Sequence, residues 1–315
     1  MKKKDPSFMI AAFAMFIAIG LVTVLSVKTA KKEGYARGFW AFSFGGKAEL
    51  RNTIEIPLSE AESLELEYGS KNIRVYPAED EKITIKEYLY SDNPKARAEV
   101  ARGADKKIKV TGGHYRNLVI FGFFVGEGER IEVYVPEEGL KEFSLQSGSG
   151  NITLKADGIK ADGVFTARAG SGNINAEGLD GGSIEIETGS GNIKAQELTG
   201  ENIAVDAGSG NIDVEELTAE NVCIEAGSGN ITTDVNDVTG KMELETGSGN
   251  IRVNLPKELK FHFTGNTGSG NIHTDFNECL LFDDKEKRAE GDIGDMPALK
   301  IAATTKSGNM NIRYR

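Results

Sequence analysis

Four acidic residues recur at nearly constant spacing in the second half of the chain, and their side chains are the first candidates for a binding site. They are Glu187, Asp206, Glu225 and Glu245, and we call them the acidic ladder. Arg168 and Asn266 are expected at its two ends. Carboxylate oxygens suit Ca²⁺, so one interpretation is a face that binds divalent cations or a basic partner. The other is a solvated face that keeps the protein soluble and discourages aggregation. We favour the second and predict no metal site, with the acidic ladder as the candidate to test.

A second candidate combines Arg252, His273 and Asp275, whose side chains are of types used in catalysis. The repeat described below puts Arg252 and His273 in one outward column, on coils expected to be adjacent. An extended β-helix face suits a long polymer, so the alternative function is a polysaccharide-active β-helix enzyme. The chain has no nucleophile elbow, phosphate loop or zinc signature, and none of its histidines (His114, His262 and His273) is at metal-ligand spacing. We therefore predict a protein that is not an enzyme, with no catalytic residue and no cofactor.

The elements that must position these residues come from a repeat. The sequence Gly-Ser-Gly-Asn-Ile occurs seven times, at intervals of about 19–22 residues. The copies start at Gly148, Gly170, Gly189, Gly208, Gly227, Gly247 and Gly268. A degraded copy spans residues 306–310, two periods further on, and another stands apart at residues 69–73. A period of about 20 residues indicates a solenoid, in which each coil buries its apolar face against its neighbours.

Within each period, apolar residues alternate with polar ones, as in Ser183-Ile184-Glu185-Ile186-Glu187. This alternation, with many β-branched residues, predicts two short strands on either side of Gly-Ser-Gly. A second corner is expected at Glu197-Leu198-Thr199-Gly200, and the glycines are expected to supply positive φ angles. The fold class is therefore all-β: a β-solenoid or single-stranded β-helix with coils of about 19–22 residues.

The Asn that follows each Gly-Ser-Gly forms a column of its own. At the strand spacing of about 4.8 Å, stacked Asn side chains can hydrogen-bond along the column, as in cross-β assemblies. The corner can alternatively be a repeated ligand-binding nest, because such turns point several backbone amides outward. We favour the structural interpretation, since a repeat needs its corner whether or not anything binds there.

The regions on either side of the regular repeats are less periodic. Residues 53–146 contain strand patterns without the period, and we predict an irregular N-terminal β region that caps the solenoid of residues 147–315. Within it, the polar stretch 91–105 has a helical pattern around Pro94–Glu99. Residues 277–297 interrupt the solenoid and are expected to form a surface loop. The chain then returns through Ile301 and Ala303 to make the last coil.

The start of the chain has the pattern of a membrane anchor. After a short tail of residues 1–6, residues 7–27 form an uncharged stretch that is long enough to span a bilayer. A cleaved signal peptide is the alternative, but Lys28 occupies a position where cleavage requires a small residue. We predict an N-terminal transmembrane helix, followed by a tether at residues 28–52 that contains aromatic residues suited to a membrane interface.

The charge distribution narrows the choice of partners. The net charge is −11, but residues 1–50 carry 8 Lys and Arg and 3 Asp and Glu, which leaves 29 basic and 45 acidic residues, or −16, on the rest. Nucleic acid is therefore not an expected partner. Cys223 lies at an outward strand position and Cys279 in the insertion, so whether they pair is left open.

The repeated Ser-Gly-Asn-Ile corner, Val135-Pro136, the Asn254-Leu255-Pro256 step and the coil from Lys306 to Ile312 resemble a bacterial family. It is the adhesin-like family of unknown function with β-strand repeats, and some membrane-anchored members belong to envelope-stress operons of Gram-positive bacteria. The resemblance covers about Thr53 to Arg315, although relatives often have Gly-Asp-Ile where this chain has Gly-Asn-Ile. The family has no established catalytic residues, so none is transferred.

The resemblance implies a cell-envelope β-solenoid that is adhesive, a sensor or a scaffold. Together with the apolar segment, it favours a single-pass membrane protein whose large domain is extracytoplasmic. The expected partners are the membrane, through the N-terminal helix, and an envelope polymer or protein. Fold alone does not establish this function.

Overall fold

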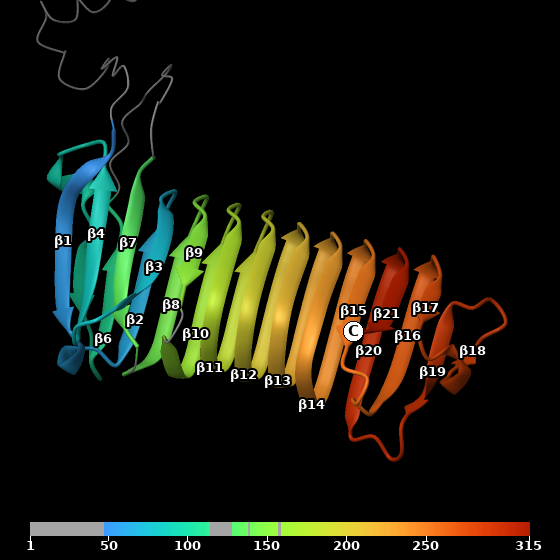
Figure 1. The fold of residues 1–315 in the computed structure, drawn as a ribbon. Coiled ribbons are helices and arrows are strands. Elements are labelled where there is room, and N and C mark those ends of the chain that lie inside the picture. Colours follow the sequence, from blue (N-terminus) through green and yellow to red (C-terminus); the bar gives the residue numbers. More distant parts are fainter. Residues whose placement is uncertain (1–46, 114–127, 138, 157–158) are drawn as a thin grey trace, which may run out of the picture. The chain divides into compact units, whose positions relative to one another are not determined.

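The computed structural model describes residues 47–113, 128–137, 139–156 and 159–315. Apart from Lys47, these residues belong to one compact unit. They form 21 strands in one hydrogen-bonded sheet, with three short 3-10 turns (Figure 1). The predicted all-β fold is therefore confirmed. The apolar segment 7–27 lies outside the described residues, and among those described no helix is long and apolar enough to cross a bilayer.

The middle of the unit is a regular stack of parallel strands. Each period is one long strand that bends at the second corner and ends at the Gly-Ser-Gly-Asn corner. The strands are β11 (Ile174–Thr188), β12 (Ile193–Ser209), β13 (Ile212–Ser228) and β14 (Ile231–Ser248). Ile174 pairs with Ile193, which pairs with Ile212, so the register advances by one period per coil.

The stacked coils enclose a continuous apolar core. One inward column, at most 4% exposed, consists of Phe165, Ile184, Ile203, Val222, Met242, Ile301 and Phe263. A second buried column consists of Ile152, Ile174, Ile193, Ile212, Ile231, Ile251, Met310 and Ile272. Alternating residues point to opposite faces of a strand, which explains why every second residue is apolar. The alternation predicted from the sequence is therefore confirmed, and Ile301 and Met310 of the returning segment belong to these columns.

The glycine corners are required mainly by stacking. A Cβ added at Gly210 would lie 1.9 Å from the carbonyl oxygen of Gly191 in the preceding coil. The equivalent distance at Gly191, to the oxygen of Gly172, is 2.0 Å. Among these corners, positive φ, the expected reason, is found only at the last glycine of four later copies. These are Gly229, Gly249, Gly270 and Gly308, with φ from +146° to +159°. The second corner has the left-handed residue Glu197 (φ 55°).

The N-terminal end departs from chain order. Strands β2 (Ser63–Tyr68) and β3 (Asn72–Ala78) form a coil that stacks directly on β8 (Leu140–Ser147) and β9 (Ile152–Lys155). Strands β6 (Lys107–Thr111) and β7 (Arg130–Pro136) pair with the other side of this coil. The isolated motif at residues 69–73 is thus the corner next to the first regular copy. From there, β10 (Lys160–Ala169) leads into the regular strands.

Antiparallel strands complete this end. Strand β4 (Lys82–Leu89) pairs with β7, β1 (Glu49–Pro57) pairs with β4, and β5 (Glu99–Arg102) pairs with β6. The expected helical segment is limited to a 3-10 turn at Pro94–Ala96, and strand β5 follows it. Pairing with β6 overrides the weak helical preference of this polar stretch.

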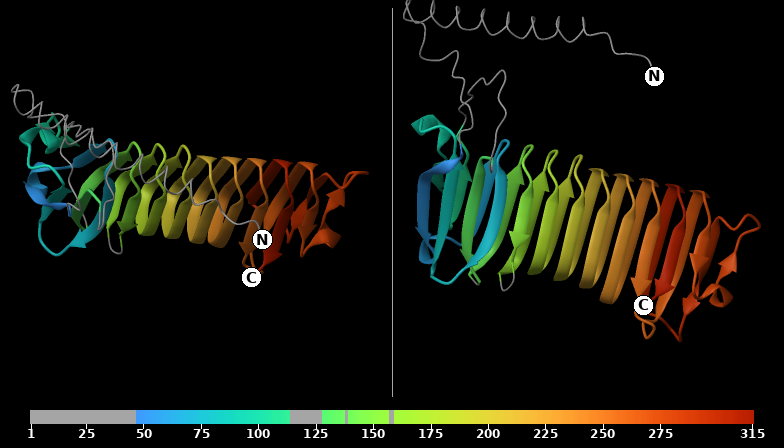
Figure 2. Two further views of the ribbon diagram at one scale, coloured as in Figure 1. Left: turned by 90° about the horizontal axis from the view of Figure 1, so that it is seen from above. Right: turned by 45° about the horizontal axis from the view of Figure 1, so that its top comes forward.

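At the C-terminal end, the chain also stacks out of order (Figures 1 and 2). After β15 (Ile251–Leu255), the chain forms β16 (Phe261–Ser269) and β17 (Ile272–Thr274), and later β20 (Leu299–Ser307) and β21 (Met310–Tyr314). Strand β20 lies between β14 and β16, and β21 lies between β15 and β17. The expectation that residues 299–314 form the last coil of the stack is therefore wrong. Every coil presents similar columns, so the pattern does not fix the order.

The insertion is a cap rather than only a surface loop. After a 3-10 turn at Asn277–Cys279, strand β18 (Leu281–Phe282) pairs with β19 (Arg288–Ile293), which pairs antiparallel with β16. Ala289 and Ile293 of β19 are buried. The Phe276 ring packs edge-on against Phe261 and Phe263, with centroids 5.3 and 5.8 Å away. These residues cover the end of the core, which corrects the predicted surface loop.

Candidate functional site

The acidic ladder exists as an in-register row of side chains. Glu187 pairs with Asp206, Asp206 with Glu225, and Glu225 with Glu245, on strands β11 to β14. Adjacent members therefore lie one strand spacing, about 4.8 Å, apart. This arrangement is a line with one carboxylate per strand, whereas Ca²⁺ takes six to eight oxygen ligands around it. Among the described residues, no group of three or more His, Cys, Asp or Glu is placed to hold a metal ion.

The two ends of the ladder differ from each other. Arg168 flanks it as expected: its Nε donates to Glu187 Oε2 at 3.0 Å and its Nη2 to Glu185 Oε1 at 2.7 Å. Asn266 does not flank the other end, because Thr304 of the inserted coil pairs with the position of Glu245. The expected position of Asn266 is therefore wrong, because the coil that contains Thr304 lies between β14 and the strand of Asn266.

Asp206 lies inside the ladder, with a carboxylate on the neighbouring strand at each side. Partial burial, followed by the negative charges of Glu225 and Glu187, raises the pKa of the Asp206 carboxyl. No basic residue adjoins Asp206 in the ladder, since Arg168 pairs with Glu187 at the end. The ladder is therefore a surface on which a cation or a basic group would relieve repulsion.

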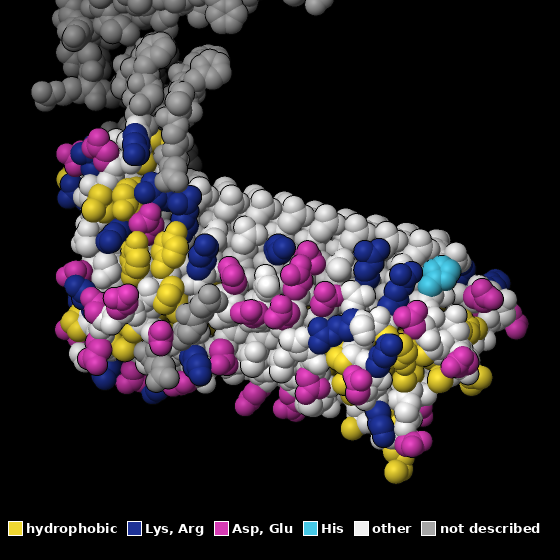
Figure 3. All heavy atoms as spheres, viewed as in Figure 1, with side chains coloured by type: hydrophobic (Ala, Val, Ile, Leu, Met, Phe, Trp, Pro, Cys, Tyr) yellow, Lys and Arg dark blue, Asp and Glu magenta, His cyan; other side chains and the backbone are white. Residues whose placement is uncertain are grey.

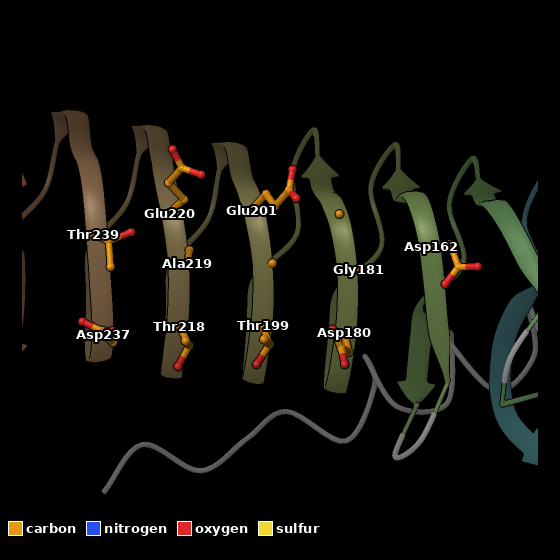
Figure 4. Close-up of a pocket in the computed structure, with 12 residues that line it drawn as sticks. Asp162, Asp180, Gly181, Thr199, Glu201, Thr218, Ala219, Glu220, Asp237 and Thr239 are labelled. Atoms are coloured by element: carbon orange, nitrogen blue, oxygen red, sulfur yellow. The ribbon is translucent and has the colours of Figure 1, made fainter.

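A second acidic feature lies beyond the second corner of the coils. A shallow groove of about 500 Å³ crosses β10 to β14, and its floor is formed by small residues of successive strands, among them Gly181, Gly200 and Ala219 (Figure 4). Its lining includes the carboxylates of Asp162, Asp180, Glu201, Glu220 and Asp237. We did not predict this groove from the sequence. The recurrence of a small residue at one position of the repeat (Gly181, Gly200, Ala219) could have indicated it.

The proposed catalytic constellation is not assembled. Arg252 pairs with Asn311, and Asn311 pairs with His273, so the inserted coil separates the two basic residues by two strand spacings, about 10 Å. The Asp275 carboxylate accepts a hydrogen bond from the backbone N–H of Tyr314 at 3.0 Å, which gives it a local structural role. Arg252 and His273 are thus not on adjacent coils, which corrects the expectation.

The two cysteines are free thiols in different surroundings. Cys223, on β13, is half-buried, and its Sγ lies 3.4 Å from Glu225 Oε1. Burial and then the Glu225 carboxylate raise the pKa of its thiol to about 11. Cys279, in the 3-10 turn of the cap, is exposed.

These features define a parallel β-solenoid with capped ends and repeated surface columns. The chain belongs to the Toastrack DUF4097 family, which matches residues 61–313. This match confirms the resemblance inferred from the corner motif. No curated protein matches the chain.

The chain is also similar to solved structures of low sequence identity over most of its length. A putative adhesin from Bacteroides fragilis is 14% identical, with a TM-score of 0.46, and the match covers 87% of this chain and 100% of that one. A putative adhesin from Parabacteroides distasonis is 11% identical, with a TM-score of 0.43 and coverage of 86% and 99%. A putative lipid binding protein from the same species is 16% identical, with a TM-score of 0.45 and coverage of 83% and 96%. At these identities the likeness concerns the fold alone.

Proposed function

We propose that the protein is a non-enzymatic, adhesin-like binding or scaffold module of the cell envelope, held to the membrane by residues 7–27. The observation that carries this proposal is the register of the coils. Outward side chains of one type repeat on neighbouring strands, as Glu187, Asp206 and Glu225 do. A surface of this kind offers equivalent contacts at regular intervals, which suits a polymer or an extended protein and provides avidity from weak contacts.

The separation of Arg252 from His273 favours binding over catalysis. General acid–base and nucleophilic mechanisms need groups that converge on one reacting centre. The best basic and acidic candidates from the sequence instead lie on separate coils, and Asp275 is held by a backbone amide. The polysaccharide-active enzyme remains the alternative function.

The envelope location rests on the sequence of the first 50 residues and on the family resemblance. Residues 7–27 carry no charge and are long enough to span a bilayer, and lysines lie on both sides of them. The proposal places the described domain outside the cytoplasm. It links the protein to envelope stress through the family members that have an anchor of this kind.

Thiol labelling of intact bacterial cells that express the full chain tests this location. A membrane-impermeant maleimide should label Cys279, which is exposed, faster than Cys223, whose thiol is half-buried with a pKa raised to about 11. The Cys279→Ser variant should lose most of the labelling, while Cys223→Ser should retain it. Labelling of Cys279 only after lysis would place the domain in the cytoplasm and overturn the proposal.

A further inference from the structure

The Asn column of the Gly-Ser-Gly-Asn corners has a defined polarity. In each case the side-chain Oδ1 accepts a hydrogen bond from the backbone N–H of the Asn in the next coil, at 2.8–2.9 Å. The bonds run through Asn72, Asn151, Asn173, Asn192, Asn211, Asn230, Asn250, Asn309 and Asn271, in spatial order. The predicted Asn ladder is therefore real, but it links side chains mainly to backbone amides.

This polarity determines what the column offers to solvent. Because Oδ1 accepts from a backbone N–H, the Nδ2 group of the amide is the part left to contact solvent or a ligand. This group has two hydrogens to donate and cannot accept a hydrogen bond. One such group, Asn250 Nδ2, donates to Asn230 Oδ1 at 3.2 Å, which uses one of its hydrogens. Apart from Asn72, the Asn residues of the column are exposed. The column is thus a row of hydrogen-bond donors spaced by about 4.8 Å.

The Ser residues of the same corners extend this row into a strip of polar side chains, in which Lys306 of the degraded corner is a charged member. Figure 3 shows the edge of the middle coils at these corners as largely white, the colour of polar uncharged side chains and backbone. We call the Ser and Asn side chains of the corners the amide strip. Amide and hydroxyl groups are suited to the hydroxyl-rich surface of a glycan, because each can exchange hydrogen bonds with water for hydrogen bonds with a sugar.

The amide strip meets an arginine at one place. A pocket of about 280 Å³ is lined there by Asn230, Thr232, Asn250, Arg252, Asn309 and Asn311. Arg252 is exposed, and its guanidinium makes no hydrogen bond or ion pair with any residue that the structure describes. The nearby carboxylate of Asp234 accepts a hydrogen bond from Asn254 Nδ2. Arg313 and His273 follow on the neighbouring strands, where Figure 3 shows basic side chains gathered over β15 and β21 beside a histidine.

We propose that this pocket binds an oxyanion of an acidic glycan, with Arg252 on the oxyanion and the amide strip along the sugar chain. A guanidinium pairs with carboxylate or phosphate through two parallel N–H···O bonds, and the adjacent Nδ2 groups supply further donors. The Nδ2 groups and Arg252 make this site rich in donors, whereas the acidic ladder offers only carboxylate acceptors, and this separates the two surfaces. The inference rests on the proposed function, and it names the ligand class of the envelope module.

The test uses the full-length protein in detergent micelles and isothermal titration calorimetry at low salt. The probes are an oligogalacturonate, which supplies carboxylates on a sugar chain, a phosphomannan oligosaccharide, which supplies phosphates on a sugar chain, and a neutral maltooligosaccharide. We expect binding of at least one anionic probe and little binding of the neutral one. Whichever anionic probe binds identifies the source of the oxyanion.

Two substitutions probe the pocket against a matched control. Arg252→Gln should weaken binding about tenfold or more, the effect of losing one charged hydrogen-bond pair. Asn250→Asp keeps the oxygen that accepts the Asn309 N–H but replaces the Nδ2 donor by an anionic oxygen, so it should weaken binding to a similar extent. Asn173→Asp makes the same change far from the pocket and should alter the affinity for a short oligomer less than about twofold.

Equal binding of the neutral probe, no binding of either anionic probe, or an unchanged affinity of Arg252→Gln would each overturn the inference. These outcomes are distinct from a failure of the proposed function. If Cys279 is labelled from outside the cell but no anionic probe binds, only the ligand class is wrong. If an anionic probe binds but Cys279 is protected in intact cells, the envelope location is wrong.

Discussion

The regular middle and the two ends of the solenoid solve the same packing problem in different ways. In the middle, β11 to β14 stack in chain order, and glycine corners allow each coil to lie directly on the previous one. At both ends a coil stacks out of order: β6 and β7 lie outside β2 and β3, while β20 and β21 lie inside β16 and β17. Antiparallel strands then pair with the outer coils.

This difference shows which interactions the two regions depend on. An exposed strand edge invites pairing with other chains, so a solenoid needs its ends covered. Each coil of the middle region has another coil on both sides, and its stacking requires that the backbones approach closely at the glycine corners. The ends require specific pairing partners, because the coil pattern alone does not distinguish one position in the stack from another.

Removal of the inserted coil should have the largest effect. Deletion of residues 299–315 takes Leu299, Ile301, Met310 and Ile312 out of the core, and their burial is worth about 6 kcal/mol. It also leaves β16 and β17 without the strands on which they stack. We expect residues beyond Leu255 to unfold and become sensitive to limited proteolysis.

The matched control is a deletion within the middle. Removing residues 193–211 joins Asn192 to Ile212 and takes out one period in register. The shortened protein should remain folded, with a melting temperature only a few degrees lower as judged by far-UV circular dichroism. Similar damage from both deletions would contradict the distinction between the middle and the ends.

Glycine substitutions should separate a corner glycine whose added Cβ would meet the backbone of a neighbouring coil from one whose added Cβ would meet no described atom. Gly208→Ala, at the corner position equivalent to Gly69, places a Cβ 2.6 Å from the carbonyl oxygen of Gly189, so it should lower the free energy of unfolding by about 2 kcal/mol. Gly69→Ala meets nothing within 4 Å and should change it by less than about 0.5 kcal/mol. Urea denaturation of both variants provides the measurement. Equal losses would show that backbone angles, rather than stacking, explain these glycines.

The smallest effect is expected from charge repulsion in the acidic ladder. The pKa of Asp206 is raised in the folded protein above its ordinary value of 3.8, so the folded state loses stability as the pH rises through and above this value. Asp206→Asn should therefore stabilise the protein by a few tenths of a kcal/mol at neutral pH, because the group is largely exposed. Below pH 3.8 the difference should disappear.

Glu187→Gln is the contrasting variant for this pH series. It removes a carboxylate that is hydrogen-bonded to Arg168, so it should bring no gain in stability at neutral pH. If Asp206→Asn were less stable than the original protein at neutral pH, repulsion within the ladder would not be its dominant electrostatic interaction.

The structure of a single coil could be predicted from the sequence, but the order in which the coils stack could not. The Ile174, Ile193 and Ile212 column follows from alternation and period, because each inward position is decided locally by burial. The position of residues 299–314 depends on pairing between distant segments, and any coil with the same columns fits equally well by pattern. The errors at Asn266 and at the Arg252–His273 pair both follow from this one misplacement.

The candidate sites on the surface were predicted only in part from the sequence. The acidic ladder lies in register as the spacing indicated, since one residue per period projects from one face. The groove beyond the second corner was missed, because its shape depends on how strands of successive coils bend past Glu197. The orientation of the Asn amides was also not predicted, because it is set by the hydrogen bond to the next coil rather than by the residue type.

The place of the inserted coil has a consequence for biosynthesis. A ribosome makes β16 and β17 before β20 and β21, yet the later pair lies between the earlier pair and the regular stack. The middle can grow by adding each coil as it emerges, whereas this end has to wait for residues 299–314. The native position between β14 and β16 can be filled only after these residues have been made, so this end cannot reach its native order one coil at a time.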